Sequence, residues 1–368
     1  MALVYTSRDL DIFVVDIPAS IEHAHGGGRT YSSQALETPF ATPEPRGKKL
    51  SAFVSKLPAD HVTYHNVIQA YCEVALKSVD WSFDSQKWHL PRTHNLGIDD
   101  VPIERAVRGD ERACLLPIVL SATQNDFAFV RDVQNELVHN DYARTAYLVF
   151  MDNVSMLVPG HCTFMWGSIK RGLGAVSERS TSTYGDPPQF DVILMDPPWA
   201  NRSVRHTQGY HTTEEQSSDP FEEALTFLDH LHPEGHVAIW ITNKAAVRCQ
   251  VLASMARLGF DLVEEWIWLK VTTKGEPVTP LHGVWRKPYE VLLIFRRGHL
   301  SAVPTRRVVI AVPDLHSRKP NLKTLFEQLL HSQLVLELFA RNLTSGWWCF
   351  GDEVLKFQDT RFWHLHPP

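Results

Sequence analysis

The residues best suited to chemistry are Asp196, Pro197, Pro198 and Trp199, which directly follow the apolar run from Phe190 to Met195. Each proline fixes its own φ and disfavours the helical region for the residue before it, so the backbone is held extended. The Asp196 carboxylate and the Pro197 carbonyl then form a rigid pair of hydrogen-bond acceptors. Such a pair can bind both N–H groups of an aromatic amine and aim its lone pair at an electrophile, which is catalysis by positioning.

Trp199 adds a flat apolar face to this segment. A base taken out of its stack could lie on that face, an interaction worth about 1–3 kcal/mol per base. The exocyclic amine of adenine is therefore a fitting target for the tetrapeptide. The alternative interpretation is a proline-rich turn with a structural tryptophan. The preceding apolar strand favours the catalytic interpretation, because ligands of open α/β sheets lie at the carboxyl ends of strands.

From about residue 160, short apolar runs alternate with amphipathic segments, a pattern typical of a doubly wound α/β domain. Near-continuous apolar strands indicate a sheet that is covered on both faces. The expected strands are residues 190–195, 236–242, 262–270, 290–295, 307–312, 334–339 and 346–351. Helices are expected to begin after the Asp219-Pro220 pair, at Ala245 and at Pro320, and Asp-Pro is a typical helix start.

The first 150 residues are predicted to form a mainly helical extension that helps to bind the substrate. Residues 61–78 and 124–139 carry apolar side chains at roughly helical spacing. Residues 24–49 are instead rich in Gly, Ser, Thr and Pro, and lack the apolar residues needed to offset the entropy of ordering. This stretch predicts a partly disordered linker.

The composition is that of a soluble protein, with 44% hydrophobic and 21% charged residues among 368. It contains no apolar run long enough to span a bilayer and no secretory signal, so we expect an intracellular protein without a membrane partner. Five scattered cysteines without CxxC spacing argue against a disulfide framework and against a metal site. Because the formal net charge is −6, any binding to nucleic acid must depend on a local basic surface.

Several segments together resemble one known family. The motifs DPPW, EWIWLK, KPYE, HSRKP, LELFARNL and GWWCFGDEVLKFQ stand in the order found in the MT-A70 family of adenine N(6)-methyltransferases. The likeness covers roughly residues 160–363 and implies a Rossmann-like domain that depends on S-adenosylmethionine. In that family the catalytic segment precedes the cofactor strand, and this permuted motif order accounts for the lack of a GxGxxG loop.

The resemblance also implies which residues form the site. Asp196, Pro197, Pro198 and Trp199 would be catalytic. S-adenosylmethionine would be bound by Asp196, Ser168, Ile169, Lys319, Glu337, Phe339, Arg341, Asn342 and Asp352. Among these, Lys319 would meet the cofactor's carboxylate, while Arg341 and Asn342 would meet its ribose hydroxyls. Two positions depart from the family pattern: Ser168 stands where an acidic residue is usual, and Asp352 stands where asparagine is usual.

Nucleic acid is the expected partner. Asn201, Arg202, Ser203, Arg205 and Tyr210 form a polar loop that could close over the base, and Lys287 and Tyr289 could line the pocket. A basic track is possible through Arg296, Arg297, Arg306, Arg307 and Arg318, although solvated loop charges are the alternative.

The resemblance to this branch of the family implies that the substrate is RNA. The methylated nucleoside would be adenosine or 2′-O-methyladenosine, for example in small nuclear RNA. The alternatives are a DNA adenine methyltransferase, or a catalytically silent nucleic-acid-binding partner subunit. We expect a nuclear and monomeric enzyme.

Overall fold

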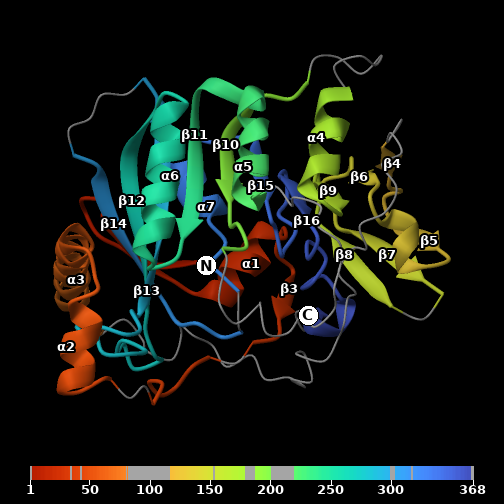
Figure 1. Ribbon diagram of the computed structural model, residues 1–368. Helices are drawn as coiled ribbons and strands as arrows, with labels where there is room; N and C mark the ends of the chain where they lie inside the picture. The colour runs from red at the N-terminus through yellow and green to blue at the C-terminus, as the bar shows by residue number, and fades with distance from the viewer. Residues whose placement is uncertain are drawn as a thin grey trace, which may run out of the picture. The chain divides into compact units, whose positions relative to one another are not determined.

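The computed structural model describes residues 2–33, 35–41, 44–79, 81, 117–151, 154–178, 187–199, 219–298, 303–315 and 318–365. Its contacts divide the chain into two units, each assembled from segments that are far apart in sequence (Figure 1). Unit 1 comprises Met1–Val101, Ile241–His331 and Thr360–Pro368, and unit 2 comprises Pro102–Trp240 and Ser332–Asp359. This division differs from the boundary predicted near residue 150, because N-terminal strands pair with strands from the C-terminal half.

Unit 2 contains a mixed sheet of apolar strands. In spatial order these are β11 (Leu231–Ile241), β10 (Phe190–Met195), β15 (Val335–Leu338), β16 (Trp348–Gly351), β9 (Thr163–Trp166), β6 (Leu137–His139) and β4 (Ile118–Val119). The five strands from β11 to β9 run parallel to one another, whereas β6 is antiparallel to β9. This arrangement confirms the predicted Rossmann-like α/β class.

The register of the parallel strands aligns their carboxyl ends. Met195 pairs with Leu338 across β10 and β15, and Leu338 pairs with Phe350 across β15 and β16. Phe350 in turn pairs with Met165 of β9. The residues that follow these four strands therefore emerge at one edge of the sheet, although they come from distant parts of the sequence.

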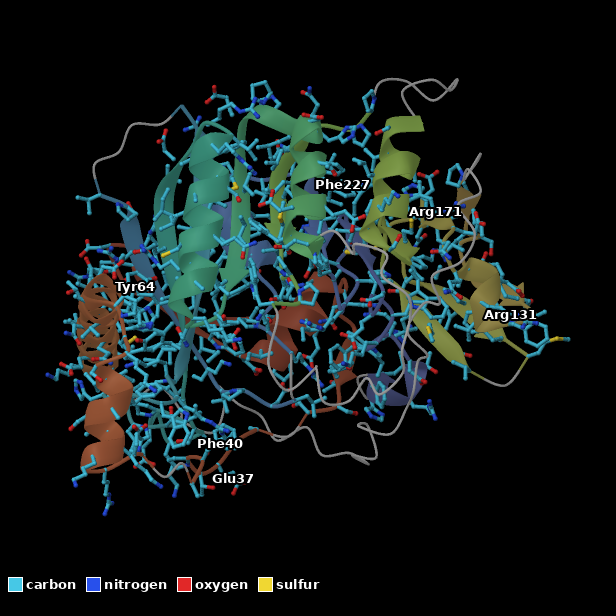
Figure 2. All side chains as sticks on the ribbon, viewed as in Figure 1. Glu37, Phe40, Tyr64, Arg131, Arg171 and Phe227 are labelled. Carbon is cyan, nitrogen blue, oxygen red and sulfur yellow. The ribbon has the colours of Figure 1, made fainter. Side chains whose placement is uncertain are left out.

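Helices α4 (Ile169–Glu178) and α5 (Pro220–Ala224), with the 3-10 helix η5 (Leu225–His230), complete this region of unit 2. The predicted Asp-Pro start is confirmed, since the Asp219 carboxylate accepts the N–H of Phe221 at 3.0 Å. Helix α4 packs on β16, where Gly172 faces the Phe350 ring. Its Arg171, labelled in Figure 2, donates from Nε to the Asn135 carbonyl at 3.1 Å.

The helix predicted over residues 124–139 is wrong. This stretch forms β5 (Gln124–Phe127), the 3-10 helix η2 (Val130–Val133) and β6. Strand β5 pairs with β7 (Ala146–Phe150), which also pairs with β8 (Ser155–Val158), and β6 pairs with β9. Backbone pairing with neighbouring strands and the burial of Leu137 and Val138 outweigh the helical spacing.

The sheet strands of unit 1 follow the order β1 (Leu3–Thr6), β2 (Ile12–Val15), β14 (Thr305–Ala311), β12 (Phe260–Lys270) and β13 (Tyr289–Arg297). Strand β14 is parallel to both β2 and β12, and β13 is antiparallel to β12. Its helices are α1 (Ile17–Ala24), α2 (Lys48–Val54), α3 (Ala59–Ser78), α6 (Ala245–Arg257) and α7 (Lys323–Leu329). The helix predicted over 61–78 is confirmed as α3.

Two local predictions in unit 1 need correction. The stretch from 24 to 49 contains a strand, β3 (Arg29–Tyr31), paired with β17 (Trp363–Leu365), which follows the 3-10 helix η6 (Thr360–Phe362). Tyr31 is fully buried and packs edge-on against Trp363, so this part of the predicted linker is ordered by an aromatic contact. Helix α7 begins at Lys323, three residues after Pro320, and the Asn321 side chain accepts the Lys323 N–H at 2.9 Å.

No helix in the described ranges has both the length and the hydropathy needed to cross a bilayer.

Two glycines of α4 give a matched test of its packing on β16. A Cβ added at Gly172 would lie 2.5 Å from the Phe350 ring, whereas one added at Gly174 would meet nothing within 4 Å. Alanine in a helix interior is worth about 0.5–1 kcal/mol over glycine, and overpacking costs about 1–3 kcal/mol. We expect Gly174→Ala to raise the urea midpoint of unfolding and Gly172→Ala to lower it. A rise in both variants would contradict the close approach of α4 to β16.

Candidate active site

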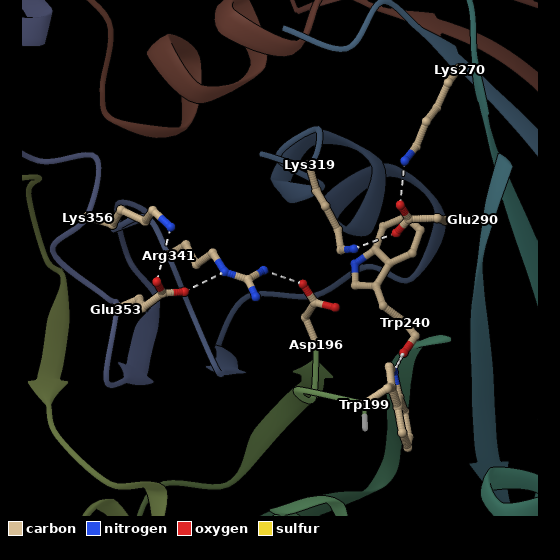
Figure 3. Close-up of polar contacts among 9 residues, drawn as sticks. All are labelled: Asp196, Trp199, Trp240, Lys270, Glu290, Lys319, Arg341, Glu353 and Lys356. Carbon is tan, nitrogen blue, oxygen red and sulfur yellow. Dashed lines mark hydrogen bonds and ion pairs between the residues drawn. The ribbon is translucent and has the colours of Figure 1, made fainter. Parts of the chain in front are cut away.

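Three charged side chains meet at the carboxyl edge of the unit 2 sheet (Figure 3). Asp196 follows β10, Arg341 lies three residues beyond β15, and Glu353 lies two residues beyond β16. Arg341 donates from Nη1 to Asp196 Oδ2 at 2.7 Å and from Nε to Glu353 Oε2 at 3.1 Å. Lys356 Nζ lies 3.1 Å from the other oxygen of Glu353. The result is a line of alternating charges that ends at Asp196.

A tight backbone turn after β15 brings Arg341 to this position. Phe339 adopts φ of 60°, a left-handed conformation that is unusual for a residue other than glycine. The next residue, Ala340, donates its N–H to the Phe350 carbonyl at 3.0 Å, which fixes the turn against β16. Strained backbone of this kind tends to occur at functional sites. Phe339, predicted from the family as a cofactor residue, therefore also shapes the site.

The DPPW segment is held by bonds of its own. The Asp196 N–H donates to the Leu338 carbonyl at 3.4 Å, and the Trp199 N–H donates to the Pro197 carbonyl at 2.8 Å. The Trp199 indole donates from Nε1 to the Trp240 carbonyl at 2.9 Å, and its ring lies 5.3 Å from that of Phe221. The Pro197 carbonyl thus accepts one bond from its own chain. A carbonyl oxygen has a second lone pair that can accept another donor.

Glu337 is the third carboxyl group of this site. It lies on β15 between Leu194 of β10 and Cys349 of β16. Burial, reinforced by the negative charge of Asp196, raises the pKa of Glu337 to about 8. Burial alone would lower the pKa of Arg341, but Asp196 and Glu353 outweigh it and raise that pKa. At neutral pH the arginine is therefore charged, and Glu337 is mainly protonated.

The other cofactor residues predicted in unit 2 lie at the same edge of the sheet, and their side chains have different surroundings. Asn342 follows Arg341, and its Oδ1 is one of the buried polar atoms in the described ranges that have no hydrogen-bond partner. Ser168 Oγ accepts the Arg171 N–H at 3.4 Å at the start of α4, and Ile169 is buried. The Asp352 side chain is exposed, while its carbonyl accepts the indole N–H of Trp166 at 3.0 Å.

These residues fit the ribose and sulfonium portions of S-adenosylmethionine. Asn342 Oδ1 and the Glu337 carboxyl are acceptors for hydroxyl groups, and a buried acceptor without a donor is costly unless a ligand supplies one. The Asp196 carboxylate is paired with Arg341 at 2.7 Å, and it still has a second oxygen that can accept a hydrogen bond from a bound ligand. The adenine end is matched less well, because Ser168 carries no charge and its hydroxyl accepts a bond within α4.

Lys319, predicted to bind the cofactor's carboxylate, belongs to unit 1. Its Nζ lies 2.7 Å from Glu290 Oε2, and Lys270 binds the other oxygen of the same carboxylate (Figure 3). Burial opposes ionisation of Glu290, but the two lysines lower its pKa to about 2. This group of two lysines and one carboxylate carries a net positive charge, which suits an anionic ligand. The role of Lys319 stays a prediction.

The two residues predicted to line the substrate pocket from unit 1 differ in their surroundings. Tyr289 is 1% exposed, and its hydroxyl lies 2.8 Å from Nδ1 of His65 on α3. Its side chain therefore packs beneath α3, and the substrate contact of Tyr289 stays a prediction. Lys287 Nζ donates to the Gly283 carbonyl at 2.8 Å, and burial lowers its pKa. Lys287 remains a candidate.

The proposed basic track is interrupted by ion pairs. Arg306 and Arg307 each lie 2.7 Å from a carboxylate, of Glu265 and Glu264 respectively. Arg318 is 1% exposed, since it pairs with Asp314 and stacks on the Tyr31 ring. These three arginines act inside unit 1. The predicted substrate loop, with Asn201, Arg202, Ser203, Arg205 and Tyr210, lies outside the described residues.

Glu353 is the site residue that the sequence interpretation missed. The family pattern points instead to its neighbour Asp352, which occupies the position of a family asparagine. Beyond β16 the chain turns so that Asp352 is exposed and Glu353 faces Arg341. The acidic pair in GDEV was visible in the sequence, but the direction of each side chain depends on this turn.

Comparison with known proteins shows which family this sequence matches. A family model described as MT-A70 matches residues 190–353, which include Asp196, Arg341 and Glu353. A protein of Pyricularia oryzae named "N6-methyladenosine RNA methyltransferase MTA1" is 30% identical over 406 aligned positions, which cover 98% of this chain and 96% of that protein.

Two further relatives match over shorter spans. A protein of Cryphonectria parasitica with the same name is 47% identical over 201 residues, covering 52% of this chain and 59% of that protein. The mouse "N(6)-adenine-specific methyltransferase METTL4" is 30% identical over 243 residues, covering 62% of this chain and 49% of the relative. This chain thus spans little more than half of the Cryphonectria protein and about half of the mouse protein.

The raised pKa of Glu337 predicts a pH dependence of stability. An unfolded glutamate titrates near about 4.3, so between that pH and about 8 the folded protein holds the extra proton. The free energy of unfolding contributed by this group is therefore largest below that window and falls as the pH rises through it. Glu337→Gln mimics the protonated acid and should remove this loss.

Thermal unfolding at pH 6, 7.5 and 9 tests the pH prediction. The melting temperature of Glu337→Gln relative to wild type should increase from pH 6 to pH 9. Glu327→Gln is the matched control, because Glu327 is a half-exposed residue of α7 paired with Lys323. A constant difference between Glu337→Gln and wild type at all three pH values would show that Glu337 is ionised in the folded protein throughout.

Proposed function

Because the chain belongs to the MT-A70 family, we propose that it transfers a methyl group from S-adenosylmethionine to the N(6) amino group of adenine in RNA. The observation that carries this proposal is the Asp196 carboxylate, which lies at the end of β10 and is bound by Arg341 at 2.7 Å. A carboxylate fixed at the carboxyl edge of a parallel sheet is well placed to orient a substrate amine.

The reaction needs orientation of a weak nucleophile. The adenine amine is weakly nucleophilic because its lone pair is delocalised into the ring. Asp196 accepts one N–H and the second lone pair of the Pro197 carbonyl accepts the other, which directs the nitrogen lone pair away from the ring plane. S-adenosylmethionine supplies the electrophilic methyl group when it is bound. A nitrogen–carbon bond would form as the donor's sulfur–carbon bond breaks, and the methylated amine would pass one proton to solvent water.

We favour RNA over DNA as the substrate because the two fungal relatives are both named RNA methyltransferases. An enzyme distinguishes RNA from DNA by its contacts to the ribose 2′ position.

We propose a monomeric nuclear enzyme that accepts adenosine or 2′-O-methyladenosine. A methyl-transfer assay on matched RNA and DNA oligonucleotides, read by nucleoside mass spectrometry, tests the substrate directly. Methylation of DNA alone would overturn the proposal.

A silent nucleic-acid-binding subunit is the rival function. It is disfavoured by the intact DPPW segment, because Asp196 supplies the carboxylate acceptor that orientation of the amine requires. Calorimetry with S-adenosylmethionine separates the two functions. Binding of the methyl donor supports the enzyme, and no binding supports the silent subunit.

Asp196→Asn should reduce turnover by about 100-fold to 1000-fold, which corresponds to about 2.7–4 kcal/mol. The amide keeps the shape of the side chain but offers one acceptor oxygen and carries no charge to pair with Arg341. Single-turnover rates at saturating donor and RNA measure this effect, and circular dichroism checks the fold. Turnover close to wild type would remove Asp196 from the catalytic role.

Asn342→Ala should raise the Michaelis constant for S-adenosylmethionine more than it lowers the saturated rate. The proposed contact of Asn342 Oδ1 with a cofactor hydroxyl exists in the ground state and the transition state alike, so its loss weakens binding uniformly. Steady-state kinetics and calorimetry measure both quantities. Unchanged donor affinity would show that the Oδ1 atom of Asn342 does not face the cofactor.

A further inference from the structure

The line of charges that ends at Asp196 is continuous and partly buried. Lys356, Glu353, Arg341 and Asp196 have side-chain exposures of 38%, 23%, 23% and 19%, so exposure falls toward the catalytic carboxylate. The successive contacts measure 3.1 Å, 3.1 Å and 2.7 Å. Only Asp196 belongs to the DPPW segment, and the other three residues approach it from beyond β15 and β16.

The geometry of the guanidinium links its two carboxylates. Arg341 binds Glu353 through Nε and Asp196 through Nη1. The guanidinium is planar and rigid. When its Nε–H is bound to one carboxylate, the direction in which its Nη1–H groups point toward the other carboxylate is therefore fixed. A lysine at this position would offer a rotatable point charge and would not transmit orientation in the same way.

We propose that Glu353 is a positioning residue for methyl transfer, which acts through Arg341 to orient the Asp196 carboxylate. This inference rests on the proposed function and adds a residue to it. Glu353 anchors the Nε end of the guanidinium, so the Nη1 end is held against Asp196 Oδ2. The carboxylate plane of Asp196 is thereby fixed before an amine is bound.

Loss of Glu353 should affect the reaction rate more than the stability of the fold. Partly exposed ion pairs add little to the free energy of folding, so loss of Glu353 should hardly alter stability. A displacement of about 1 Å in a reacting group can nevertheless cost about 100-fold in rate. Without Glu353, the long Arg341 side chain loses its Nε anchor and can adopt other rotamers near Asp196. The consequence should be a lower saturated rate.

Lys356 helps to keep Glu353 ionised. Burial opposes ionisation of Glu353, but its bonds to Lys356 and Arg341 outweigh burial and lower the pKa of Glu353. Glu353 is therefore an anionic acceptor at neutral pH, which suits the charged Nε–H of Arg341.

Two variants of Glu353 distinguish positioning from other roles. Glu353→Gln keeps a side-chain oxygen at the reach needed to accept the Arg341 Nε–H, whereas Glu353→Ala removes the acceptor. We expect Glu353→Ala to lower kcat by about 10-fold to 100-fold and to change the Michaelis constant for S-adenosylmethionine by less than about threefold. Glu353→Gln should recover most of the lost rate. Glu327→Ala in α7 is the matched control and should leave kcat unchanged.

A readout that does not require activity comes from NMR of arginine side chains labelled with nitrogen-15 at Nε. The Arg341 signal is assigned by its disappearance in Arg341→Lys. In the full-length wild-type protein its Nε–H should exchange slowly with solvent, because Glu353 accepts it. Exchange should accelerate in Glu353→Ala and stay slow in Glu353→Gln and in Glu327→Ala.

The outcomes separate this inference from the proposed function. Equal rates in Glu353→Ala and wild type would overturn it, as would a raised Michaelis constant with unchanged kcat, which would make Glu353 a direct ligand. Equal losses of kcat in both Glu353 variants, with unaltered Arg341 exchange, would also overturn it. If the wild type methylates neither RNA nor DNA, the proposed function fails, and the exchange rates still decide whether Glu353 orients Arg341.

Discussion

The guanidinium of Arg341 compensates the negative charge that three sheet strands bring to one edge. Asp196 follows β10, Glu337 lies on β15 and Glu353 lies beyond β16, and each of the three interacts with Arg341. Three ionised carboxylates around one arginine would repel each other, and the site avoids this in two ways. Glu353 receives a second cation from Lys356, and Glu337 keeps its proton because its pKa is raised to about 8. The site is then close to neutral, with a negative carboxylate on Asp196.

This charge arrangement is possible because parallel strands place their carboxyl ends together. The pairings of Met195 with Leu338 and of Leu338 with Phe350 put the following residues at the same height. A slip of one residue would reverse the faces of β15, moving Glu337 away from its present neighbours. The left-handed turn at Phe339 then redirects the chain so that Arg341 returns toward Asp196. Chemistry at this edge therefore depends on strand register first and on a single strained turn second.

Much of this organisation could be predicted from the sequence, because it depends on local patterns. The strand before DPPW was predicted with its observed bounds, and long apolar runs identified β12 and β13. Features governed by distant partners could not be predicted. Tyr289 is paired with His65 across more than 200 residues, and Arg318 is buried by Tyr31 and Asp314. The orientation of Glu353 depended likewise on the turn after β16, which no periodicity encodes.

The DPPW segment is held rigid by hydrogen bonds as well as by its two prolines. The two prolines restrict the backbone by themselves, yet the structure adds bonds at both ends, from Asp196 N–H to Leu338 and from the Trp199 indole to Trp240. These bonds lie outside the atoms that would meet a substrate amine. A segment held at both ends loses little further conformational entropy when a substrate binds. The Asp196 carboxylate can therefore be oriented mainly by its contact with Arg341, which makes this ion pair the decisive element of the site.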